Sequence, residues 1–401
     1  MVLNSGFTFL KSLFKKNDLE KNQFFENKNE MLKYLNLQTT LSLTDQEKLT
    51  IQQLKEALKD HHLMIVISES LSSEYLKWMP FLTELSKESI FFKNMYANGR
   101  RSVEGVAAIL SGIPALMEEP FLNSEFASNE FVGIGQLYKN LNYETRFYHG
   151  AKNGSMRFDS FSEASGFKEY HGLNEFRKSN FAKPEAIDPT WGVYDSEFFN
   201  YICDINKKSF EKKMDVIFTL SLHYPFNIPT FFQPTIKFDL QNSEKNKIVQ
   251  SIQYYDDSLK KFFSCLQKNS DFKKMVFIIL ADHTGPQLET DPNDFEAKFK
   301  IPLIIYSADT NIQNLFKKSL DTNQFAQQID LLPTLNDLFD LRLGSKNHMA
   351  RSLLMRGPKT IVLYTDRHHQ MVGDSIKSEN HLKAFKQYFS EGMYDNRLYY
   401  K

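Results

Sequence analysis

Short apolar runs alternate with helical patterns along most of the chain. Five runs are apolar without alternation, as in strands that are covered on both faces, and they span residues 63–68, 216–222, 276–281, 301–307 and 360–365. The segment "IFFKNMYA" (residues 90–97) is a further candidate strand or extended segment. Between the runs, apolar residues at steps of four and three predict a helix over residues 248–266. Strands that alternate with helices predict an α/β fold with a mainly parallel central sheet and helices on both faces.

The first 62 residues differ from this pattern because they are polar and rich in Lys, Asn and Glu. Residues 44–47, "TDQE", form a capping-box pattern, and Ile51, Leu54 and Leu58 follow at helical spacing. We therefore expect residues 1–62 to form a polar N-terminal arm that ends in a helix.

The composition mainly excludes certain partners and certain kinds of site. The 401 residues carry 49 basic and 49 acidic side chains, which argues against a nucleic-acid partner bound by bulk charge. Cys203 and Cys265 lack metal-type spacing, so neither a disulfide framework nor a thiolate zinc site is expected. No apolar run approaches the length of a membrane span, and the N-terminus lacks a clear signal peptide.

Chemically active side chains follow three of the predicted strands. Glu69 follows the first run, His223 follows the run at 216–222, and Asp282 and His283 follow the run at 276–281. The carboxyl ends of parallel strands meet at one edge of a sheet, where α/β proteins place their sites. Carboxylate oxygen and imidazole nitrogen suit manganese or zinc. Each residue alone also has an ordinary structural interpretation as a cap or loop residue, but together they favour a site.

Ser102 adds a candidate nucleophile to the same region, directly after Arg100 and Arg101 at a predicted helix start. The hydroxyl has two interpretations: it caps the helix, or it attacks a phosphate that the two guanidinium groups bind. A divalent cation would lower the pKa of this serine and neutralise phosphoryl oxygen.

The motifs together resemble the sulfatase-like domain of the alkaline phosphatase superfamily, in its lipoteichoic acid synthase-like, phosphoglycerol transferase branch. In chain order, the matching segments are "VISES", "NGRRSVEG", "FYHGAKNGSMRFDSF", "WGVYDSEFF", "SLHYPF", "LADHTG" and "QIDLLPTLNDLFDL". The resemblance implies a catalytic domain over residues 63–341 and a small C-terminal subdomain, residues 342–401, that completes the fold.

The resemblance also implies roles for individual residues. It makes Glu69, Asp282 and His283 metal ligands, and it makes Ser102 both the nucleophile and a further ligand. His223 matches the histidine that contacts the substrate and serves in catalysis. The remaining substrate-binding candidates are Arg100, Arg101, His149 and Arg157; for the last two, an ordinary polar surface loop is the alternative.

Two departures from the family pattern bear on the reaction. Members of this branch usually carry threonine as the nucleophile, whereas this chain has serine. Sulfatases that convert a cysteine or serine to formylglycine need a following proline and arginine, but Ser102 is followed by "VEGV". Sulfate-ester hydrolysis is therefore disfavoured. We expect a metal-dependent phosphotransferase with a covalent Ser102 intermediate, and the alternatives are a phosphodiesterase or phosphatase, or non-catalytic binding of an anionic glycan or lipid headgroup.

The resemblance further implies the cofactor, the partners and the location. Manganese is the expected ion, with zinc or magnesium as alternatives. A phospholipid headgroup donor and a glycan or glycerol-phosphate acceptor are the expected substrates, on the extracytoplasmic face of a membrane or in a periplasm. The chain lacks the membrane helices typical of the family, which leaves three alternatives open: a soluble domain fragment, a product of a split gene, or a form that relies on a separate membrane partner.

Overall fold

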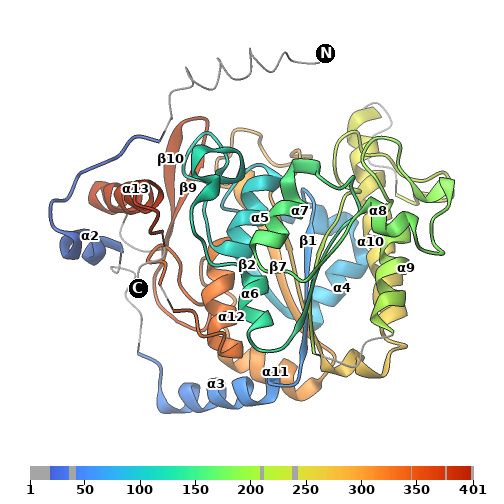
Figure 1. Ribbon diagram of the computed structural model, residues 1–401, viewed down its shortest axis with the longest axis horizontal. Coiled ribbons are helices and arrows are strands. Elements are labelled where there is room, and N and C mark those ends of the chain that lie inside the picture. Colours follow the sequence, from blue (N-terminus) through green and yellow to red (C-terminus); the bar gives the residue numbers. More distant parts are fainter. Residues whose placement is uncertain are drawn as a thin grey trace.

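The central sheet is present and mainly parallel (Figure 1). The computed structural model describes residues 19–35, 42–207, 212–236, 243–344, 346–374 and 377–398. The sheet has the strand order β4-β3-β5-β1-β6-β7-β2-β8. Its strands are β1 (His62–Ser68), β2 (Ile90–Tyr96), β3 (Glu144–His149), β4 (Glu169–His171), β5 (Lys213–Phe218), β6 (Met275–Ala281), β7 (Lys300–Ser307) and β8 (Ala326–Gln327).

Helices cover both faces of this sheet, as predicted. Helix α5 (Ser102–Ser111) contacts α6 (Ile134–Lys139) and α12 (Leu331–Phe339) on one side of the sheet, and α10 (Ser243–Leu266) contacts α4 (Pro80–Glu88) and α9 (Asp195–Asn206) on the other (Figure 1). Strands β1 and β6 are buried at every position, which explains their unbroken apolar runs. The α-helices are α2 (Lys28–Leu35), α3 (Asp45–Leu58), α4 (Pro80–Glu88), α5 (Ser102–Ser111), α6 (Ile134–Lys139), α7 (Phe158–Ala164), α8 (Leu173–Arg177), α9 (Asp195–Asn206), α10 (Ser243–Leu266), α11 (Thr310–Ser319), α12 (Leu331–Phe339) and α13 (Glu379–Tyr394).

One strand of the sheet runs against the others. Strand β7 is antiparallel to both of its neighbours, β6 and β2. A parallel pair needs a crossover connection, usually an α-helix, but only a loop with a short 3₁₀ helix joins β6 to β7. The chain therefore turns back directly, and β7 begins at the edge of the sheet where β6 ends.

Two of the predicted runs have different boundaries or partners in the structure. Strand β5 ends at Phe218, before the apolar run ends at Leu222, because the Asp195 carboxylate accepts hydrogen bonds from the backbone N–H groups of Leu220 and Ser221. The run at 360–365 is not part of the central sheet. It forms β9 (Thr360–Thr365), which pairs antiparallel with β10 (His368–Gly373) in a separate two-stranded sheet.

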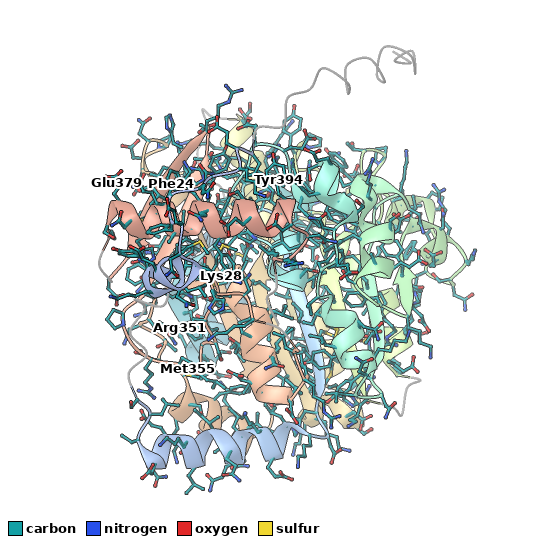
Figure 2. The ribbon with its side chains drawn as sticks, turned by 60° about the vertical axis from the view of Figure 1, so that its left-hand side comes forward. Phe24, Lys28, Arg351, Met355, Glu379 and Tyr394 are labelled. Atoms are coloured by element: carbon teal, nitrogen blue, oxygen red, sulfur yellow. A yellow bond between two sulfur atoms is a disulfide. The ribbon has the colours of Figure 1, made fainter. Side chains whose placement is uncertain are left out.

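The N-terminal region contains the predicted capped helix, and it also contacts the C-terminal helix α13. Helix α3 begins after Thr44 with the predicted capping box to Glu47. Further upstream, Phe24 and Phe25 donate backbone hydrogen bonds to the Gln387 side chain on α13. Helix α2 lies beside α13, so the two ends of the described chain pack together (Figure 2). The predicted arm also includes residues 1–18 and 36–41, which lie outside the described residues.

The prediction that the two cysteines form no disulfide framework was wrong, because they are bonded to each other. Cys203 on α9 and Cys265 on α10 form a disulfide across 62 residues of sequence. The two helices pack side by side on one face of the sheet, which brings the two distant cysteines together. Among the described residues, no helix has both the length and the apolar character needed to cross a membrane.

Candidate active site

Glu69 lies immediately after β1 and is almost completely buried. Its backbone N–H donates to Thr219 Oγ1 at 3.0 Å, and its Oε1 accepts a 2.6 Å hydrogen bond from Ser70 Oγ. Ser70 has a positive φ of 51°, an uncommon backbone conformation for a serine. In this conformation its backbone N–H also donates to Asp282 Oδ1 at 2.8 Å. The turn after β1 therefore orients both buried carboxylates.

Asp282 and His283 follow β6, the neighbour of β1 in the sheet. His283 Nε2 lies 3.3 Å from Asp282 Oδ2 and 3.6 Å from Glu69 Oε1. Its Nδ1 is 2.9 Å from the carbonyl oxygen of Thr284, which places a proton on Nδ1, so the neutral ring has its lone pair on Nε2. This is the arrangement in which an imidazole can bind a cation through Nε2.

Ser102 is the first residue of helix α5, and Arg101 occupies the cap position. The cap interactions come from Glu104, whose carboxylate accepts hydrogen bonds from the backbone N–H groups of Arg100 and Arg101. Ser102 Oγ instead donates to Glu69 Oε2 at 3.2 Å and lies 3.3 Å from His283 Nε2. Its hydroxyl is therefore directed to the acidic cluster and is not used as a helix cap.

The cluster concentrates negative charge in a buried place. One ligand-type atom from each of Glu69, Asp282 and His283 lies within 4.8 Å of the others. Burial and the nearby Glu69 carboxylate raise the pKa of Asp282 to about 7. Burial alone would lower the pKa of His283, but Asp282 and Glu69 raise it, and the net shift is upward. A cation in this position would neutralise the charge that causes these shifts.

The donor set of the cluster fits a divalent cation. Asp282 Oδ2 is buried and has no hydrogen-bond partner among the described residues, which is costly for a carboxylate oxygen. Together with Glu69, His283 Nε2 and Ser102 Oγ, it offers oxygen and nitrogen donors of the kind that zinc and manganese bind.

His149 ends β3 and His223 follows β5, and both strands lie on the side of β1 away from β6. His149 ends β3, where it pairs in register with Phe218, and burial lowers its pKa to about 4. The Nδ1 atom of His149 is 3.1 Å from the Phe218 carbonyl oxygen, and that of His223 is 2.8 Å from the Tyr224 carbonyl oxygen. Both rings therefore keep the proton on Nδ1, as His283 does, and have their Nε2 atoms available for a ligand.

The loop that carries His223 is held by residues of the "WGVYD" segment. The Trp191 ring centroid lies 4.1 Å from that of His223, and Trp191 Nε1 donates to the Tyr224 carbonyl oxygen at 2.6 Å. Asp195 is buried and accepts from the backbone N–H groups of Leu220 and Ser221 at 3.0 and 2.9 Å. Sequence reasoning singled out this motif but did not assign Asp195 a role.

The three candidate arginines differ in their surroundings. Arg101 is engaged within the protein, because its guanidinium donates to Glu104 and to the carbonyl oxygen of Glu118. Arg100 is exposed, and its guanidinium lies 5.9 Å from the centre of the Phe299 ring. Arg157 is also exposed, has a positive φ of 62° and donates to the Leu122 carbonyl oxygen at 3.3 Å.

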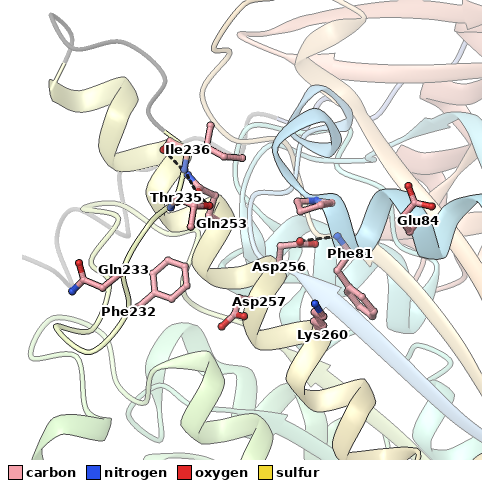
Figure 3. A pocket seen from close by; sticks show the side chains of 11 residues that line it. Phe81, Glu84, Phe232, Gln233, Thr235, Ile236, Gln253, Asp256, Asp257 and Lys260 are labelled. Carbon is pink, nitrogen blue, oxygen red and sulfur yellow. Dashed lines mark hydrogen bonds between the residues drawn. The ribbon is translucent and has the colours of Figure 1, made fainter.

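A separate cavity of about 540 Å³ lies between α4, α10 and the loop at residues 232–236 (Figure 3). Asp256 lines it and accepts from the backbone N–H groups of Phe81 and Leu82 at the start of α4. Gln253 holds the loop by accepting from the backbone N–H groups of Thr235 and Ile236. The cavity shares no residue with the Glu69–Ser102–Asp282–His283 cluster, and two of its polar side chains, Asp256 and Gln253, connect α10 to α4 and to the loop.

Comparison with known proteins places the chain in a family. The Sulfatase family model matches residues 61–341. A lipoteichoic acid synthase-like protein of Bacillus subtilis is 21% identical over 306 residues, which cover 72% of this chain and 47% of that protein. Phosphoglycerol transferase I of Escherichia fergusonii is 25% identical over 248 residues, which cover 55% of this chain and 30% of that protein. The chain thus spans less than half the length of these two relatives.

A solved structure shares the fold over nearly the whole chain. It is that of a protein in the alkaline phosphatase superfamily from Vibrio parahaemolyticus, with a TM-score of 0.72 and 21% identity. The superposition covers 96% of this chain and all of the other. With the family model matched over most of its length, the chain belongs to the Sulfatase family of enzymes and has the fold of the alkaline phosphatase superfamily.

Proposed function

We propose that this protein transfers a phosphoglycerol-type headgroup from a phosphodiester donor to an alcohol acceptor through a covalent intermediate on Ser102. The observation that carries the proposal is the position of Ser102 Oγ, 3.2 Å from Glu69 and 3.3 Å from His283 in the acidic cluster. The similarity to phosphoglycerol transferase I and to a lipoteichoic acid synthase-like protein supports the choice of headgroup.

The reaction has two displacement steps at phosphorus. In the first, Ser102 Oγ loses its proton to solvent and bonds to phosphorus, while the bond from phosphorus to the lipid oxygen breaks. The departing oxygen takes up a proton, and the role that we propose for His223 is to take this proton from solvent on Nε2 and pass it on. In the second, an acceptor hydroxyl loses its proton and attacks the phosphoserine, and Ser102 Oγ is released and protonated again.

Glu69, Asp282, His283 and Ser102 would hold a divalent cation, with manganese as the proposed ion and zinc or magnesium as alternatives. Such a cation lowers the pKa of the serine hydroxyl and offsets charge on a phosphoryl oxygen. Ser102 also stands at the N-terminus of α5, where the helix dipole favours a negatively charged oxygen.

We assign substrate binding to the remaining residues that the sequence analysis singled out. Arg100 is exposed next to the nucleophile, and its forked donors suit phosphate oxygens. The Nε2 atoms of His149 and His223 are suited to bind the headgroup. Arg101 contributes mainly positive charge, because Glu104 and Glu118 already bind its side chain. Arg157 is assigned to the outer part of the same substrate site.

The proposed donor is a phospholipid, the proposed acceptor is a glycan or a glycerol-phosphate chain, and nucleic acid is not a partner. The Cys203–Cys265 disulfide supports an extracytoplasmic location, because such bonds persist mainly in oxidising compartments. A separate membrane protein that supplies the lipid is part of this proposal.

The test is intact-protein mass spectrometry after incubation with manganese and phosphatidylglycerol vesicles. Wild-type protein should gain one phosphoglycerol unit, and Ser102→Ala should gain none. Ser111→Ala is the matched control, because Ser111 is a buried serine on the same helix. An equal adduct on Ser102→Ala would contradict the nucleophile. Release of glycerol phosphate without any acceptor would instead identify a hydrolase.

A further inference from the structure

Gln328 connects the segment that leads into Ser102 to the segment that carries Asp282 and His283. It opens a 3₁₀ helix, Gln328–Asp330, and is completely buried. Its Nε2 donates to the carbonyl oxygens of Ala281 at 2.7 Å and Asp282 at 2.6 Å. Its Oε1 accepts a 2.7 Å hydrogen bond from the backbone N–H of Asn98. One planar amide thus holds three backbone groups.

These three backbone groups belong to strands that are not neighbours in the sheet. Asn98 follows β2 and leads into the Ser102 turn, whereas Ala281 and Asp282 end β6 and begin the ligand segment. Strand β7 lies between β2 and β6, so the two strand ends are about 10 Å apart by strand spacing alone. Because β7 is antiparallel, it only begins at this edge. Gln328 bridges across it.

Neighbouring residues hold Asn98 and Gln328 in one network. The Asn98 side chain donates to Gln327 Oε1 at 2.8 Å and accepts from the backbone N–H of Ile329 at 3.0 Å. Gln327 in turn donates to the Met349 carbonyl oxygen at 3.0 Å. The bridge is therefore fixed at both ends and does not depend on one flexible side chain.

We propose that Gln328 is a positioning residue that sets the distance between Ser102 and the Asp282–His283 pair. The catalytic part of this inference rests on the proposed function, because it assumes that Ser102 and the two ligands act together. Its action is indirect: Gln328 contacts the backbone of Asn98 and Asp282 and touches no substrate. The distances of 3.2 and 3.3 Å from Ser102 Oγ to its two neighbours depend on both strand ends being held in place.

The test compares Gln328→Met with Gln313→Met. Methionine keeps the length of the side chain and removes the amide. Gln313 is a matched control, because it is buried and also bridges two backbone segments, with Nε2 donating to the Glu88 carbonyl oxygen and Oε1 accepting from Ser307 N–H. It is in contact with none of the candidate ligands in these bonds. Both variants lose a comparable buried bridge, and only one of the two bridges reaches the site.

Three readouts separate positioning from general stability: Mn²⁺ affinity by calorimetry, Tm, and kcat against KM for the lipid donor. Gln328→Met should weaken Mn²⁺ binding at least tenfold and lower kcat at least tenfold, with KM changed less than threefold. Gln313→Met should lower Tm to a similar degree and change Mn²⁺ affinity less than twofold. Gln328→Asn keeps the amide on a shorter side chain, so its Mn²⁺ affinity should be intermediate; it also serves if the methionine variant does not fold.

The outcomes distinguish this inference from the proposed function. Equal Mn²⁺ affinities in the Gln328 and Gln313 variants would overturn the positioning role, even if wild type is active. A wild type that binds Mn²⁺ but transfers no headgroup would overturn the function, and the Mn²⁺ affinities would still decide the role of Gln328. A wild type that binds no divalent cation would overturn both.

Discussion

Gly105 packs directly against the backbone of Asp282. A Cβ atom added to Gly105 would overlap the carbonyl oxygen, the carbonyl carbon and the Cα of Asp282. The first turn of α5, which carries Ser102, can therefore approach the end of β6 only because residue 105 has no side chain. This close approach brings the candidate nucleophile and the candidate ligands together.

Gly105→Ala should therefore damage both stability and the site. Overpacking of this kind typically costs about 1–3 kcal/mol, and here the displaced group is the backbone of a candidate ligand. We expect a lower free energy of unfolding and at least a tenfold loss of headgroup transfer. Gly344→Ala is the control, because an added Cβ there meets nothing within 4 Å. Urea unfolding and the mass assay measure the two effects, and wild-type transfer by Gly105→Ala would contradict the argument.

A second prediction concerns the cation. If the cluster binds manganese, added Mn²⁺ should raise Tm, since a ligand at 100 times its Kd stabilises a protein by about 2.7 kcal/mol. Glu69→Gln replaces a charged oxygen donor in the cluster and should abolish most of this rise. The exposed Glu84, which pairs with Lys87, offers the control Glu84→Gln. A Tm that responds equally to Mn²⁺ in wild type and Glu69→Gln would exclude the cluster as the binding site.

Much of the fold could be predicted from the chain, because strands buried on both faces have a recognisable apolar pattern. The predicted runs at 276–281 and 301–307 match β6 and β7 to within one residue. The direction of β7 could not be predicted, because an apolar run looks the same in either direction. It also could not be predicted that β9 lies outside the central sheet, since a strand in a small separate sheet can be equally apolar.

Some residues of the candidate site could likewise be predicted from the sequence, and others could not. Glu69, Asp282 and His283 could be proposed because each follows a strand, and parallel strands end at one edge. Ser70 and Gln328 could not, because they act through hydrogen bonds to the backbone that exist only once the strands are assembled. The motif beginning at Gln328 was visible in the sequence, but its contact with Asp282 was not.

Asp195 gives a third prediction. Its carboxylate accepts from Leu220 N–H and Ser221 N–H and so fixes the loop that carries His223. Asp195→Asn turns one of the two acceptor oxygens into an NH₂ group, so one of the two hydrogen bonds to the loop is lost. We expect the loop to shift and kcat/KM to fall about tenfold or more, since displacements of 1 Å in a site can cost 100-fold.

The control for Asp195→Asn is Asp204→Asn on the same helix, where the carboxylate pairs with Lys207 near the surface. Steady-state kinetics with the lipid donor and hydrogen exchange of residues 219–226 would measure the effect. Faster exchange in that segment without any kinetic change would show that the loop does not contribute to turnover.

The last prediction concerns acid stability and rests on His62, at the start of β1. Burial is the main cause that lowers its pKa from 6.5 to about 4, and Lys213 and Lys274 lower it while Asp271 and Asp215 raise it. Its Nδ1 accepts a hydrogen bond from the Lys213 backbone N–H at 3.2 Å, which requires the neutral ring. The folded protein therefore binds a proton at His62 less readily than the unfolded chain does. The stability that this group contributes is complete above pH 6.5 and is lost as the pH falls from 6.5 to about 4.

Within that window, one histidine changes the free energy of unfolding by up to about 1.4 kcal/mol per pH unit. His62→Asn keeps an acceptor for the Lys213 N–H and cannot take up the proton, so its stability should fall less steeply with acid than that of wild type. Urea unfolding at half-unit steps between pH 7 and 4.5 would compare the slopes. Parallel curves for wild type and His62→Asn would mean that His62 is not protonated on unfolding in this range.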